Sequence, residues 1–130
     1  MPYQIVYDPT NRILRARFEG RVTEDELREV YRLGQVQAAR IDPHAGITDF
    51  SDVTTLAFSP ETIYKLATST PIMRDPSRLV VFVASTPHIF GMARMFEILG
   101  GETRPNLHVV RTLEEAYELL HVREPQFEPI

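Results

Sequence analysis

Apolar and polar residues alternate along a segment close to the start of the chain. Leu14, Ala16 and Phe18 fall on one side of this segment, and Arg15 and Arg17 fall on the other. A period of two residues is typical of a β-strand with one face on the core and one face in water. The pattern therefore predicts a strand whose arginine-bearing face is open to solvent.

A second strand is predicted just before the first. Residues 3–7 carry the β-branched and aromatic side chains that favour strands, and Asp8-Pro9-Thr10-Asn11 after them is favourable for a tight turn. We expect residues 3–7 and 13–19 to form an antiparallel hairpin.

Four later segments carry the signals of helix starts. Thr23 and Thr112 each precede a glutamate by three residues, which is the spacing of a capping box. Ser59 and Thr86 are each followed by proline, a residue suited to the first helical position. Each signal is followed by apolar residues at helical spacing, so we expect four helices.

The remaining strands complete the fold class. Residues 79–84 are apolar without alternation, as in a central strand covered on both faces, and residues 47–50 and 107–111 are shorter strand candidates. The order predicts an α/β fold: a mixed, mostly parallel five-stranded sheet with an antiparallel N-terminal edge hairpin and four helices. We expect one domain over residues 1–122 and a loosely ordered C-terminal tail over residues 123–130, which hold two prolines and no periodicity.

Composition excludes several classes of function. The formal net charge of −4 argues against general affinity for nucleic acid, and the absence of cysteine excludes disulfides and thiolate chemistry. No apolar run approaches the roughly 20 residues of a membrane span, and the first residues lack the pattern of a secretory signal. We expect a cytoplasmic location.

Five short stretches stand out within this order of elements. They are FEGRVT (18–23), DFSDV (49–53), FSPE (58–61), FGMARMFE (90–97) and VRTLEEA (110–116). Together they resemble the STAS fold of anti-sigma-factor antagonists, and more closely its stage II sporulation protein AA-like (SpoIIAA-like) branch, a bacterial family without an assigned activity. The resemblance covers about residues 3–121 and implies a regulatory domain that binds other proteins.

The resemblance directs attention to Ser59. In phosphorylatable members an Asp-Ser-Ser-Gly motif opens the helix after the third strand, and a partner kinase modifies a serine there. The matching residues are Ala57-Phe58-Ser59-Pro60, so only Ser59 is retained. From the residues alone, Ser59 is expected to cap the helix, and a regulatory role is the alternative. The closer branch is also grouped by fold with CRAL-TRIO lipid-binding domains, which implies an apolar ligand as a second possibility.

No catalytic or metal-binding constellation is found. The four histidines are scattered, and Asp49 and Asp52 lack the ligand spacing and the glycine of a calcium loop. No nucleophile elbow or phosphate-binding glycine loop is present. We therefore expect no enzyme activity, no metal and no cofactor.

The third predicted helix is apolar almost all round. Burial between neighbouring helices, a homodimer interface and a small-molecule pocket each account for this pattern. The residues expected to form a partner or ligand surface are Phe90, Met92, Met95, Phe96 and Leu99. We expect a non-enzymatic STAS-like domain that binds a protein partner, or a second copy of itself, through helices two and three. The alternative is a CRAL-TRIO-like domain for a small apolar ligand.

Overall fold

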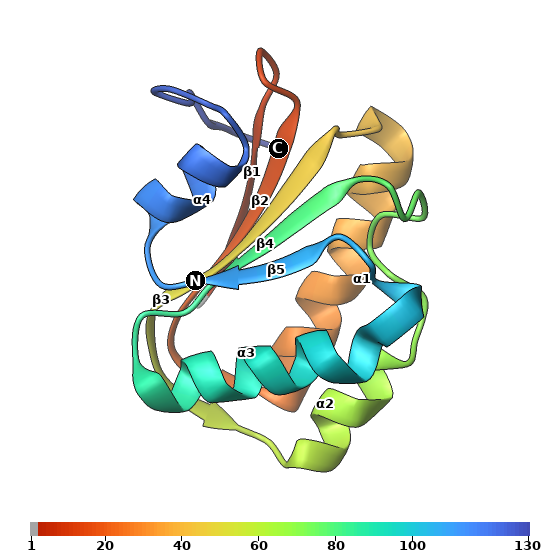
Figure 1. Ribbon diagram of the computed structural model, residues 1–130, viewed down its shortest axis with the longest axis vertical. Coiled ribbons are helices and arrows are strands. Elements are labelled where there is room, and N and C mark those ends of the chain that lie inside the picture. Colours follow the sequence, from red (N-terminus) through yellow and green to blue (C-terminus); the bar gives the residue numbers. More distant parts are fainter. Residues whose placement is uncertain (1–2) are drawn as a thin grey trace.

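The alternating and fully apolar segments pair into one mixed sheet with helices on both faces, seen in the computed structural model of residues 3–130 (Figure 1). The strands are β1 (Tyr3–Asp8), β2 (Ile13–Thr23), β3 (Ala45–Ala57), β4 (Leu79–Val83), β5 (Leu107–Val110) and β6 (Glu128–Pro129). The helices are α1 (Glu24–Ile41), α2 (Pro60–Ala67), α3 (Pro87–Gly100) and α4 (Leu113–Leu119), with a 3₁₀ turn, η1 (Gly101–Thr103), after α3.

The strand order is β5-β4-β3-β2-β1-β6. β2, β3, β4 and β5 pair in parallel, and β1 is antiparallel to both of its neighbours. This arrangement confirms the predicted α/β class, the four helices and the antiparallel hairpin. The sheet has one strand more than predicted, because β6 pairs with the outer side of β1.

Helix starts follow the capping signals only in part. The Thr23 and Thr112 hydroxyls accept hydrogen bonds from the backbone N–H groups of Glu26 (3.2 Å) and Glu115 (3.1 Å), as capping boxes require. The threonine before Pro87 and the serine before Pro60 make no such bond, although both have the extended backbone of an N-cap. In these two helices the proline and the backbone alone mark the start.

β3 is much longer than the segment 47–50 predicted from the sequence. It runs to Ala57 because its pairing with β2 continues past two irregularities in register, next to Glu19 and Gly20, as far as Thr23. Gly20 has φ +68°, a left-handed conformation that suits glycine at such a bulge. The second half of β3 is rich in serine, threonine and aspartate, so no apolar alternation indicated it.

One face of the sheet is covered by α1, α2 and α3. Leu14, Ala16 and Phe18 of β2 point to this face and are buried, as the alternation predicted. Val30 of α1 and Ala93 of α3 pack in the same cluster as Phe18. The main core therefore lies between the sheet and these helices.

The other face is covered by α4 and by the C-terminal segment. Ile13, Ile47 and Val83 pack there with Ala116 of α4, and Phe127 lies against the same cluster. The Arg15 guanidinium lies 4.2 Å from the centre of the Phe127 ring, so Arg15 is half-buried rather than fully open to solvent. The arginine-bearing face of β2 is thus partly covered.

The C-terminal segment makes specific contacts where the sequence predicted a loosely ordered tail. Glu128 and Pro129 pair with Tyr7 and Val6 of β1, and the Gln126 N–H donates to the Asp8 carboxylate (3.3 Å). Two short strand residues and one aromatic ring leave no periodic signal in a sequence, so the pattern did not indicate this attachment.

Asp8 joins the hairpin turn to that segment. Its buried carboxylate also accepts bonds from Thr10 N–H (3.0 Å), Asn11 N–H (3.1 Å) and the Asn11 side-chain amide (2.7 Å). Burial by itself would raise the pKa of Asp8, but these hydrogen bonds to the charged form outweigh it and hold the pKa below its ordinary value.

Asp8→Asn is expected to lower the free energy of unfolding by about 1–3 kcal/mol at pH 7, because an amide cannot replace all the accepted bonds. A carboxylate whose pKa is lowered by folding stabilises the protein above its unfolded pKa, and this contribution is lost as the pH falls below about 4. Urea unfolding of both proteins at pH 7 and pH 3 should show the difference shrinking at the lower pH. An equal difference at both values would contradict the assigned role of the charge.

Candidate functional site

Ser59 lies at the exposed start of α2, in the position that the sequence predicted. Its carbonyl accepts from the Thr62 N–H (3.0 Å), but its hydroxyl makes no capping hydrogen bond. The expected stabilisation by a side-chain cap is therefore missing at this helix. The hydroxyl lies, without a cap bond, at the positive end of the helix dipole.

The five residues predicted as a surface on α3 are divided among different surroundings. Met92 and Phe96 point inward and line a cavity, and Phe90 lies beneath the Arg111 guanidinium, 4.0 Å from its ring centre. Met95 is half-buried and Leu99 is exposed. Helix α3 therefore presents an inner face to the cavity and an outer face to solvent.

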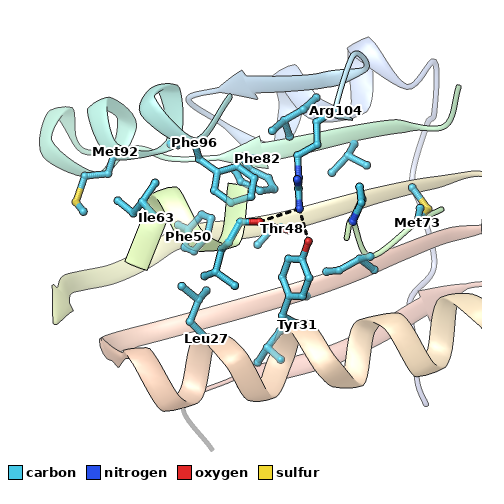
Figure 2. Close-up of a pocket in the computed structure, with 18 of the residues that line it drawn as sticks. Leu27, Tyr31, Thr48, Phe50, Ile63, Met73, Phe82, Met92, Phe96 and Arg104 are labelled. Carbon is cyan, nitrogen blue, oxygen red and sulfur yellow. Dashed lines mark hydrogen bonds between the residues drawn. The ribbon is translucent and has the colours of Figure 1, made fainter. Parts of the chain in front are cut away.

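The cavity has a volume of about 130 Å³ and lies between the sheet and helices α1, α2 and α3 (Figure 2). Most of its lining is apolar and comes from β2, β3, β4 and the three helices, with one wall formed by the irregular segment 71–78. The polar residues that line it are Tyr31, Thr48, Arg78, Thr103, Arg104 and Asn106.

Aromatic rings form one wall of the cavity. Phe18 and Phe50 are stacked with centres 5.4 Å apart, and Phe82 meets the edge of Phe50 at 5.8 Å. Phe96 of α3 continues the series, 5.2 Å from Phe82. Rings in these arrangements attract one another beyond simple burial, so the wall is firmly held.

Arg104 supplies the main polar contact of the cavity. Its guanidinium donates to two carbonyl oxygens at the end of α2, on Leu66 (3.1 Å) and Ala67 (2.5 Å), and to the carbonyl of Ser69 just after the helix (3.2 Å). It also donates to the Tyr31 hydroxyl of α1, a contact drawn in Figure 2. The last carbonyls of a helix have no partner within it and carry negative partial charge, so a cation there is favourable.

Several contacts hold Arg104 in place. Its guanidinium lies over the Phe96 ring, 4.9 Å from the centre. Gly100 accommodates its aliphatic stem, since a Cβ at that position would lie 3.0 Å from the Arg104 Cδ. The Tyr31 hydroxyl in turn donates to the Thr70 carbonyl (2.6 Å). The guanidinium therefore connects α1, the end of α2 and the turn after α3.

The charge of Arg104 has no carboxylate partner within residues 3–130. Burial lowers the pKa of its guanidinium, and the Tyr31 hydroxyl acts in the opposite direction. Arg78, the other arginine of the cavity, is paired with Asp75 (3.2 Å) and Asp42 (3.5 Å). Sequence reasoning missed Arg104 and Tyr31, because neither lies in a motif and they are 73 positions apart.

Other candidate chemistry is dispersed. All four histidines are exposed, and no group of three or more histidine, aspartate or glutamate side chains within residues 3–130 is placed to hold a metal ion. The buried Asp49 carboxylate accepts from the N–H and hydroxyl of Ser51 (2.9 and 2.5 Å), and Asp52 pairs with Arg17. Both aspartates lie within β3, and their partners are structural ones on β3 and on the neighbouring strand β2.

A comparison with solved structures identifies the fold. The structure of the anti-sigma factor antagonist SpoIIAA in its unphosphorylated form superimposes with a TM-score of 0.63 over 94% of this chain and 99% of that one, at 10% sequence identity. No family model and no curated protein matches the sequence. The chain has a STAS-like fold. None of the helices in residues 3–130 has the length and apolar character needed to cross a bilayer.

Arg104→Met is expected to lower the free energy of unfolding by about 2–4 kcal/mol, because the Ala67 and Ser69 carbonyls lose the guanidinium that donates to them. Tyr31→Phe removes only one shared hydroxyl and should cost about 1 kcal/mol. Denaturant unfolding would measure both. Arg21→Met, at an exposed arginine, is the matched control and should change stability by less than about 0.5 kcal/mol. Equal effects of the two arginine substitutions would contradict this role of Arg104.

Proposed function

We propose that this chain is a non-enzymatic regulatory domain that binds a protein partner through the outer side of α2 and α3. The observation that carries the proposal is the likeness in fold to an anti-sigma factor antagonist, which extends over 94% of this chain. Antagonists of that kind act by association, and the dispersed polar residues described above supply no nucleophile with a neighbouring base.

Exposed apolar side chains mark the surface that would take part. Tyr64 of α2 is 55% exposed, and Ile98 and Leu99 of α3 are 69% and 36% exposed. Met95 lies three and four positions before Ile98 and Leu99, so these three share one side of α3. We call Tyr64, Met95, Ile98 and Leu99 the outer patch. Helices α2 and α3 pack against each other, and we propose that the patch residues of both helices belong to one binding surface.

Ser59 would provide regulation at the start of α2. Its hydroxyl is exposed and makes no cap bond, and a phosphate there would face the N-terminus of the helix. Pro60 removes one N–H that could hold such a group, and Ala57 replaces the aspartate of the phosphorylatable motif. Modification of Ser59 is therefore proposed to alter the partner surface by its charge rather than by reshaping the helix.

A second function is supported by a separate observation. The apolar cavity beneath α2 and α3 is the kind of concave, mostly apolar site that binds small molecules. We propose small-molecule binding there as a companion to partner binding. The two sites would lie on opposite sides of α3.

Ile98→Asp is expected to weaken binding of the partner by at least tenfold, about 1.4 kcal/mol, because it places a charge in the outer patch. The tagged wild-type chain would be recovered from its source organism with its bound proteins identified by mass spectrometry. Val36→Asp is the matched control, since Val36 is 53% exposed on α1. A partner retained by Val36→Asp and lost by Ile98→Asp supports the proposal, and a partner lost by neither or both contradicts it. Sedimentation of the purified proteins shows whether a second copy is that partner.

Ser59→Ala is expected to change the free energy of unfolding by less than about 0.5 kcal/mol, since no side-chain cap is lost. Ser59→Asp should leave the fold intact and weaken the same partner by tenfold or more if charge at this position regulates binding. Thermal unfolding and the capture assay above measure the two effects. Partner binding unchanged by Ser59→Asp would remove Ser59 from the proposed function.

A further inference from the structure

The cavity has an apolar region with a polar contact across it. In Figure 2, Arg104 and Tyr31 meet across the cavity, with Phe50, Phe82 and Phe96 on one side of the pair and Met73 on the other. A ligand that enters beside the phenylalanines would therefore meet aromatic rings along its body and a guanidinium at its end.

The volume limits the size of the ligand. An engineered protein cavity of about 150 Å³ lined by apolar side chains accommodates one benzene molecule. The cavity of this protein, at about 130 Å³, is of similar size. A single ring or a short hydrocarbon chain fits such a space, whereas a long acyl chain does not.

The charge of the residues that line the cavity determines which polar group a ligand would carry. Among the described residues that line the cavity there are two arginines and no aspartate or glutamate, although the chain carries 18 acidic residues. Arg78 is neutralised by its carboxylate partners, and the four Nη protons of Arg104 meet only neutral oxygens. The Arg104 Nε–H makes no hydrogen bond within residues 3–130.

A carboxylate is the group that this guanidinium lacks. Hydrogen bonds between a guanidinium and a carboxylate are shorter and stronger than those to neutral oxygens, and more so where water is excluded. An acid at this position would accept from Nε–H and compete with the Tyr31 hydroxyl for the neighbouring Nη protons. Burial also destabilises the lone charge, as the lowered pKa of Arg104 indicates, and an anionic ligand would relieve that cost.

We propose that the cavity binds a small monocarboxylic acid whose apolar body is about the size of one benzene ring, with its carboxylate on Arg104 and its ring among Phe50, Phe82 and Phe96. The proposal names the ligand of the second function given above and is independent of the outer patch.

The methionines allow a direct test on the full chain. Met73 and Met92 line the cavity, while Met95 lies on the same helix as Met92 outside the lining. In protein labelled with ¹³C at the methionine methyl groups, added benzoate is expected to shift the Met73 and Met92 signals in a saturable way at about millimolar concentration. The Met95 signal should not move. Benzamide has the same shape without the charge and should bind at least tenfold more weakly.

Two variants test the location. Ala93 lines the cavity, so Ala93→Leu should fill it and abolish the benzoate shifts, whereas Ala39→Leu, at an exposed position on α1, should leave them unchanged. Their folding is checked by thermal unfolding. Arg104→Lys keeps the positive charge but loses the planar set of N–H donors. It should lower the affinity for benzoate more than the affinity for benzamide.

The possible results separate the two levels of the proposal. If benzamide bound as tightly as benzoate, recognition of a carboxylate by Arg104 would be contradicted, while small-molecule binding in the cavity would stand. If palmitate shifted these signals and benzoate did not, the proposed ligand size of about one benzene ring would be contradicted, while small-molecule binding would again stand. No shift of Met73 or Met92 with any of the three compounds would overturn both the inference and the ligand-binding function.

Discussion

The guanidinium of Arg104 is the contact on which the arrangement of the three covering helices depends. Helix α2 has only eight residues, a length at which a helix is not stable by its own hydrogen bonds. Arg104 donates to carbonyls at its C-terminal end and to Tyr31 of α1, so three segments distant in sequence meet at one cation. The walls of the cavity are joined there by polar bonds, in addition to the apolar packing of Val30 and Ala93 in the main core.

The two faces of the sheet are covered unequally, and this inequality decides where binding is proposed. Helix α4 and the C-terminal segment pack closely over a compact cluster that includes Ile47 and Val83. On the opposite face α3 lies between a cavity and solvent, with Phe96 on the inner side and Ile98 on the outer side. A change in how α3 lies on the sheet would therefore be felt at both sites, since the same helix supplies residues to each.

The sequence was sufficient for the parts of the fold that rest on local signals. The alternation in β2 identified Phe18 as core, and the capping boxes located the starts of α1 and α4. The polar second half of β3 was missed because its pairing with β2 depends on register and leaves no apolar pattern. Arg104 was missed for a similar reason, because a single arginine acquires its role only when distant segments meet. The all-apolar pattern of α3 indicated an unusual helix, but the choice between burial, a partner surface and a cavity required the packing itself.

The short pairing of β6 with β1 has a consequence for how the protein behaves at high concentration. An uncovered strand edge offers free N–H and C=O groups to another chain and is a common starting point for aggregation. Along β1 these groups are partly occupied by β6, a two-residue strand whose proline cannot donate to a further strand. The opposite edge is β5, which has four residues. Neither edge of the sheet described here therefore offers a long strand for pairing with another chain. Removal of the last residues would expose β1, which would then be the longer of the two edge strands.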